Sequence, residues 1–168
     1  MTISMYQASI PLLIRGLTQL SHILDKGEKH AQEHNIDPLV LTSARLFPDM
    51  LPLTAQVQIA ADISKGCGAR LSGTQPPSFD DTEKSFEELK ARIEKTIAFL
   101  KECKAEDIDG SEEREIELKL RTSTFQFSGQ GYLTMFVLPN VYFHITTTYN
   151  ILRHNGVNLG KVDYVGGA

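Results

Sequence analysis

The residues of this chain that could do chemistry gather around one histidine in a long apolar stretch, residues 129–156. Asn140 and His144 stand four residues apart, so a helix over this stretch places both side chains on one face. An imidazole titrates near neutral pH and serves as a general acid, a general base or a metal ligand. Two metal ligands on one helix would use the same spacing. The pattern therefore makes His144 the centre of the candidate site, with Asn140 beside it.

Two further polar residues are predicted to face the same core from a helix over 49–72. At about 100° per residue, Gln56 lies at the centre of the apolar face of this helix, with Asp49 roughly 20° away. Buried amides need hydrogen-bond partners, and His144, Gln56 and Asn140 could satisfy one another. The same side chains could instead line a small-molecule pocket, or hold a divalent metal with Asp49 as an added ligand. Because neutral amides are poor ligands for first-row metals, we predict that no such metal is tightly bound.

The apolar periodicity predicts an all-α chain with one short β insertion. Residues that recur at steps of three and four predict four long helices, over 3–34, 49–72, 82–104 and 130–155. Between the third and fourth helices the period changes to two, which predicts two short strands within 115–128. A four-helix bundle follows from this order of elements.

The remaining segments are predicted to connect or cap these helices. Asp81 or Thr82 is expected to cap the third long helix. Residues 105–114 are acidic and are expected to form a loop, and the glycine-rich tail 157–168 is expected to be irregular. We find no repeat or linker, so residues 1–168 are predicted to form a single domain.

Composition excludes several classes of function. The net charge is −4, which offers no steering towards nucleic acid. No apolar run is long enough to predict a membrane span, and the N-terminus does not resemble a secretory signal. Cys67 and Cys103 form no paired motif, which fits a reducing compartment. A cytoplasmic protein is therefore expected.

Several segments together carry a resemblance that covers nearly the whole chain. They include RLFPDMLPL (45–53), QVQIAAD (56–62), ARLSG (69–73), SFDDTEKSFEELKARIEKTIAFL (78–100) and LPNVYFHITTTYNILRHNGVNLGKVDY (138–164). These segments resemble a family of small proteins of unknown function that is similar to the DinB-like bundles, a group described as metal-dependent enzymes. The resemblance implies an up-down-down-up four-helix bundle that is often dimeric. It also implies a relation to metal-dependent hydrolases and thiol-dependent transferases.

The resemblance also implies which positions would hold a metal. Metal-binding DinB-like proteins use one histidine of the second helix and an H-x-x-x-H pair of the fourth, followed by a leucine-arginine pair. Counting back from Leu152-Arg153 places the second histidine of that pair at His144 and the first at Asn140. The histidine of the second helix falls near Gln56. His144 is thus the one ligand position that is retained.

Three functions remain open from the sequence. The first is a small-molecule pocket in which His144 is the acid or base and Asn140 and Gln56 orient it or the substrate. The second is a metal-dependent hydrolase or transferase of the DinB-like type. The third is a non-enzymatic dimeric structural or interaction protein.

The fourth long helix also predicts a homodimer. Opposite Asn140, a second apolar face carries Leu138, Tyr142, Ile145 and Tyr149. A helix that is apolar on all sides must pack its second face against another element. The simplest such element is the same helix of another subunit. The alternative is that the N-terminal stretch or the glycine-rich tail of the same chain folds over this face.

Overall fold

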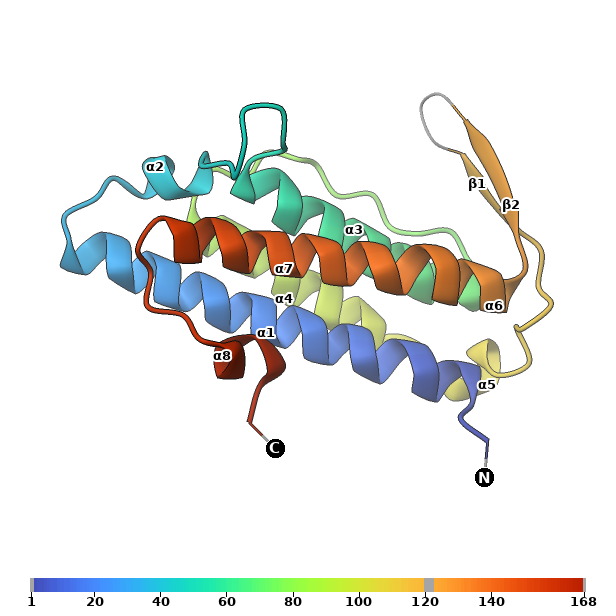
Figure 1. The fold of residues 1–168 in the computed structure, drawn as a ribbon. Coiled ribbons are helices and arrows are strands. Elements are labelled where there is room, and N and C mark those ends of the chain that lie inside the picture. The colour runs from blue at the N-terminus through green and yellow to red at the C-terminus, as the bar shows by residue number, and fades with distance from the viewer. Residues whose placement is uncertain (1, 120–122, 168) are drawn as a thin grey trace.

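The computed structural model describes residues 2–119 and 123–167, and this part of the chain is mostly helical. The four long helices are α1 (Met5–Glu33), α3 (Leu53–Leu71), α4 (Phe86–Glu102) and α7 (Leu138–His154), which lie side by side (Figure 1). The shorter helices are α2 (Pro38–Thr42), α5 (Ala105–Ile108), α6 (Gly129–Gly131) and α8 (Lys161–Val165). A π-helical segment, η1 (Tyr132–Val137), joins α6 to α7.

The core lies between the long helices. α3 packs against α7 and α4, and α1 packs against the same two helices. Each long helix contributes buried side chains at three- and four-residue steps, among them Leu13, Leu17, Leu20 and Leu24 of α1, Val57 and Ala60 of α3, Leu89 and Ile93 of α4, and Val141 and Ile145 of α7. Each such leucine, isoleucine or valine side chain contributes about 1.5–3 kcal/mol by leaving water, which outweighs the weak helix propensity of any one turn.

Residues 72–85 connect α3 to α4 by a long route. The connection runs back along the bundle (Figure 1), instead of turning directly from one helix into the next. α4 then begins at Ser85, whose hydroxyl accepts from Glu88 N while the Glu88 carboxylate accepts from Ser85 N. This capping box fixes the start of α4, so the prediction that Asp81 or Thr82 caps the helix is wrong.

The predicted strands form an antiparallel hairpin of β1 (Ile116–Lys119) and β2 (Thr124–Phe127). The register pairs Ile116 with Phe127 and Lys119 with Thr124. A lone hairpin is marginally stable in water, and this one is anchored because Ile116 and Leu118 are buried in the core.

Two predicted boundaries differ from the structure at the start of α3 and in the tail. α3 begins at Leu53, not at residue 49, because Pro52 holds an extended backbone as its N-cap. The tail is not irregular throughout, since Lys161–Val165 form α8. α8 is held by the Asp163 carboxylate, which accepts from Gly160 N at 2.8 Å and pairs with Lys26 Nζ at 2.7 Å. A single helical turn, α5, also lies within the predicted loop 105–114.

The last long helix changes its winding before Pro139. Residues 129–154 are helical as predicted, but Tyr132–Val137 are wound as a π-helix. Proline has no N–H to donate, and its ring clashes with the carbonyl four residues earlier in a regular α-helix. A widened turn ahead of Pro139 relieves that clash. Across the described residues, no helix is both long enough and apolar enough to span a membrane.

Candidate functional site

Gln56 and His144 form one hydrogen-bonded pair in the interior of the bundle. His144 Nδ1 lies 2.6 Å from Gln56 Oε1, and the exposed fractions of the two residues are 8% and 2%. Gln56 projects from the second turn of α3 and His144 from the middle of α7, the two helices that pack most closely together. The structure thus brings together two of the predicted site residues.

The second hydrogen bond of Gln56 fixes the direction of the first. Gln56 Nε2 donates to the Leu51 carbonyl at 3.1 Å, so Gln56 Oε1 faces the imidazole as an acceptor. His144 Nδ1 must therefore carry the proton, which leaves the Nε2 lone pair available in the neutral ring. Burial lowers the pKa of His144 below its usual 6.5, because the interior disfavours the imidazolium. At neutral pH the pair presents Nε2 as a hydrogen-bond acceptor.

Asn140 lies on the same helix but bonds elsewhere. Asn140 Nδ2 donates to the Phe136 carbonyl at 2.6 Å, one turn earlier in the helical run. Asparagine side chains commonly compete for nearby backbone groups in this way. The expected three-way network of His144, Gln56 and Asn140 is therefore a two-residue pair, with Asn140 tied to its own helix.

Asp49 does not lie on the face of α3. It is exposed in the turn before that helix, where Met50 N donates to the Phe47 carbonyl at 3.0 Å. Within the described residues, no group of three or more His, Cys, Asp or Glu side chains is arranged to hold a metal ion. The donor set around His144 thus consists of one imidazole and one neutral amide, which is a weak set for a first-row metal.

Exposed apolar side chains flank the Gln56–His144 pair. The ring of Phe143 meets the His144 ring edge-on, with ring centroids 5.3 Å apart, and Phe143 is 55% exposed. Leu51, whose carbonyl holds Gln56, is 46% exposed. The hollows described below, beside Arg92 and at the end of α3, are lined by other residues.

A buried arginine forms a second polar centre, which the sequence analysis missed. The side chain of Arg92 is 1% exposed, and its guanidinium pairs with Asp62 at 2.7 Å, Asp81 at 2.8 Å and Glu83 at 2.9 Å. Burial alone would lower the pKa of Arg92, but the hydrogen bonds to Glu83 and Asp62 outweigh it and raise the pKa. Arg92 thereby ties α4 to α3 and to the long connection.

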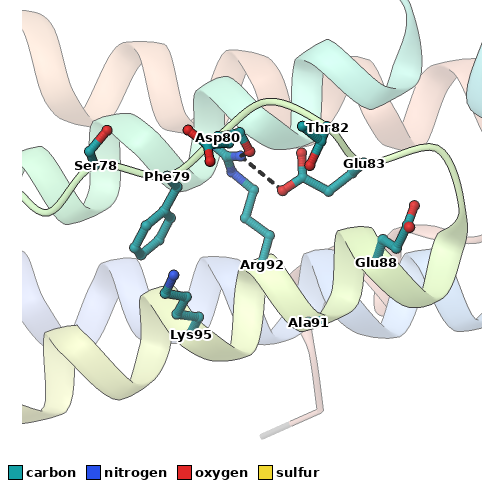
Figure 2. Close-up of a pocket in the computed structure, with 9 residues that line it drawn as sticks. All are labelled: Ser78, Phe79, Asp80, Thr82, Glu83, Glu88, Ala91, Arg92 and Lys95. Atoms are coloured by element: carbon teal, nitrogen blue, oxygen red, sulfur yellow. Dashed lines mark hydrogen bonds and ion pairs between the residues drawn. The ribbon is translucent and has the colours of Figure 1, made fainter.

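A hollow of about 410 Å³ opens beside Arg92 (Figure 2). Phe79 and Lys95 lie on one side of the close-up and Glu88 on the other, with the Arg92–Glu83 ion pair between the helix and the connection. Lys65 Nζ and Lys95 Nζ lie 3.9 and 4.1 Å from the centre of the Phe79 ring. These contacts hold the connection against the bundle. The sequence did contain a signal for this cluster, since Arg92 lies beside the apolar stripe of α4 and an acidic segment precedes that helix.

Comparisons with known proteins agree with this architecture. The family model described as "Domain of unknown function (DUF1993)" matches residues 5–165. The crystal structure of a DinB family member from Shewanella denitrificans is similar, with 35% sequence identity and a TM-score of 0.88. That match covers 97% of this chain and 92% of the other. No curated protein matches the chain.

Proposed function

This chain belongs to the DUF1993 family of domains of unknown function and has a DinB-like fold, and on that premise we propose that it binds a small molecule at His144. The bundle is the up-down-down-up type, a proposal supported by the long return of residues 72–85 between α3 and α4. In this proposal the position that holds a metal in the DinB-like bundles no longer binds one in this chain. The neutral imidazole of His144, the one retained ligand position, contacts the small molecule instead.

The hydrogen bond from His144 Nδ1 to Gln56 Oε1 carries the proposal. It joins two buried residues of different helices at 2.6 Å, and the Leu51 carbonyl holds the amide in one orientation. With Nδ1 committed, Nε2 is the atom that meets a ligand, either as an acceptor or as a general base. Asn140, one turn earlier on α7, would orient that ligand through its amide oxygen, since its NH₂ group donates to the Phe136 carbonyl.

The surroundings of the pair indicate which ligand would fit. Phe143 and Leu51 are apolar and largely exposed, so they would cover the non-polar part of a bound molecule. Nε2 would accept a hydrogen bond from a single N–H or O–H group of that molecule. A small, neutral, mostly apolar molecule with one hydrogen-bond donor, such as a phenol or a lactam, meets both requirements.

Ligand-detected binding measurements test the proposal. A library of phenols and lactams is screened by NMR against protein purified without a histidine tag. We expect hits whose affinity falls about tenfold in His144→Phe, because one good hydrogen bond to Nε2 is lost while the ring shape remains. His154→Phe, a change of an exposed histidine at the end of α7, is the matched control and should leave the affinity unchanged. Hits that bind both variants equally would contradict the proposal.

Metal analysis of the same tag-free protein separates the alternative functions. Stoichiometric zinc or nickel that is lost in His144→Phe would instead support a metal-dependent hydrolase or transferase, with Asp49 as a further ligand. If the protein contains no metal and binds no compound of the library, the non-enzymatic function as a homodimer is favoured.

A further inference from the structure

A second polar hollow lies at the end of α3 that is remote from His144. It has a volume of about 470 Å³ and lies between the last turn of α3, the turn that follows and strand β1. Arg70, Arg114 and Lys119 contribute side chains to its lining. Arg70 follows Gln56 by fourteen residues along α3, which corresponds to about 21 Å. The hollow is therefore separate from the Gln56–His144 pair.

The two arginines of this hollow are held by neutral oxygens. Arg70 Nη1 donates to the Tyr132 hydroxyl at 3.1 Å, and Arg114 Nη1 donates to the Leu71 carbonyl. Burial raises the pKa of Tyr132 to about 12, so its phenol stays neutral and leaves the charge of Arg70 uncompensated. In the parts of the chain the structure describes, neither arginine forms an ion pair. Each guanidinium has five N–H groups, so several donors remain for a ligand.

Two glycines lie beside these guanidinium groups. A Cβ at position 66 would collide with Arg70 Nη1, so Gly66 lets the Arg70 side chain fold back over its own helix. Gly73 has a φ of +74°, which turns the chain out of α3, and a Cβ there would lie 3.5 Å from Arg114 Nη1. Gly66 thus leaves room for the Arg70 guanidinium, and the hydrogen bonds to Tyr132 and to the Leu71 carbonyl hold both arginines in place before any ligand arrives.

The charge of the hollow favours an anion. Lys119 Nζ pairs with Glu117 at 2.9 Å, and Gln126 Nε2 also donates to the Glu117 carboxylate at 2.9 Å. That pair is locally neutral. Two guanidinium groups then face one further carboxylate, Glu115, which is exposed. The hollow is thus locally cationic, although the whole chain carries a net charge of −4.

We propose that this hollow binds the carboxylate or phosphate group of a small molecule between Arg70 and Arg114. The planar guanidinium fork matches both groups with paired N–H···O bonds, which a lysine cannot do. The hollow is larger than a single ion, so the anionic group would be one end of a metabolite-sized ligand. Glu115 stands at the same hollow and competes with the anion.

Titration of the full chain tests this site. Inorganic phosphate and succinate are the two probes, each compared with sodium chloride at equal ionic strength, and binding is followed by calorimetry and by the arginine Nε–H signals in NMR spectra. We expect saturable binding of at least one probe that shifts the signals of Arg70 and Arg114. The tighter probe then tells whether the natural ligand carries a phosphate or a carboxylate.

Matched variants connect the binding to the named groups. Arg70→Gln and Arg114→Gln should each weaken binding about tenfold, since each removes a charged fork. Arg70→Lys and Arg114→Lys keep the charge and the fold but lose the fork, and should weaken binding as well. Glu115→Gln should tighten binding about twofold or more, because a competing charge is removed. Arg45→Gln is the control, as Arg45 lies outside this hollow and donates to the Met50 carbonyl before α3.

Two results would overturn the proposal. One is that neither phosphate nor succinate binds beyond the effect of chloride. The other is binding that Arg70→Lys and Arg114→Lys leave unchanged, with Glu115→Gln no tighter than wild type. The His144 variants have no part in this test, so the two sites stand or fall separately.

Discussion

At the residue scale, the surroundings of His144 favour the neutral form of its imidazole ring. Burial disfavours the imidazolium, and the neighbouring group is an amide that carries no charge to compensate it. A carboxylate at position 56 would have the opposite effect. Gln56→Glu should therefore raise the pKa of His144 above that of the wild type, which an NMR titration of the ring measures directly.

The lowered pKa of His144 predicts a pH dependence of stability. Below about 6.5 the unfolded chain binds more protons at this residue than the native chain does, so native stability falls as the pH falls from 6.5 towards the native pKa. Above 6.5 the neutral form gives its full contribution. His144→Asn keeps a donor for Gln56 but does not titrate.

Urea unfolding at pH 7 and pH 5 measures this dependence. We expect the free energy of unfolding to fall more between these pH values in the wild type than in His144→Asn. Equal losses in the two proteins would mean that the native pKa of His144 is not lowered.

At the element scale, the sequence predicts long regular helices better than the contacts that fix their ends. The pairing of Gln56 with His144 was accessible because both sit near the centre of long apolar faces, where helical periodicity places a side chain reliably. The hydrogen bond of Asn140 could not be predicted in the same way, because a backbone carbonyl on its own helix competes for the amide. Arg92 was missed because its acidic partners lie in other segments, whose fold the periodicity of α4 does not predict.

The start of the last helical run depends on a close approach at Gly129. A Cβ at this position would overlap the carbonyl oxygen of Ser111, so the segment before β1 packs directly against the backbone of α6. Gly129→Ala should lower the free energy of unfolding by about 1–3 kcal/mol, the usual cost of overpacking. Gly167→Ala, where a Cβ would meet nothing, should cost little and is the control in the same denaturation series. A Gly129→Ala protein as stable as this control would show that the contact is not tight.

The Arg92 cluster should hold the long connection in place. In Arg92→Leu the carboxylates of Asp62 and Glu83 lose their common partner, and we expect a loss of about 1.5–3 kcal/mol. Limited proteolysis should cut residues 78–84 faster, while the centres of α1 and α7 stay resistant. Uniformly faster cleavage of all helices would mean that Arg92 supports the whole core and not the connection.

At the scale of the whole molecule, the second apolar face of α7 is partly covered by the chain itself. Ile145 is 1% exposed, and Tyr164 of α8 packs edge-on against Tyr149 with ring centroids 6.2 Å apart. Thr146 Oγ1 also donates to the Tyr164 hydroxyl at 3.0 Å. The sequence could not show this cover, because α8 is short and is held by contacts to α1 and α7. Tyr142 remains 40% exposed at the uncovered part of the face.

The predicted homodimer would therefore use the part of α7 around Tyr142. We expect light scattering at micromolar concentration to give about twice the 18.7 kDa of one chain. Tyr142→Glu should reduce the mass to that of one chain, and because Tyr142 is exposed the fold should survive this change. A wild-type mass of one chain would mean that α8 is the cover of this helix and that the dimer does not form.

The proposed site requires that His144 is a neutral ring with its proton on Nδ1 and its Nε2 open to a ligand. A two-bond ¹H–¹⁵N spectrum of tag-free protein at pH 7 measures this tautomer directly. The Gln56 contact predicts the Nδ1–H pattern for His144, and Gln56→Leu should release it into a mixture of tautomers. An Nε2–H tautomer, an imidazolium, or a metal-bound Nε2 in the wild type would contradict the proposed site.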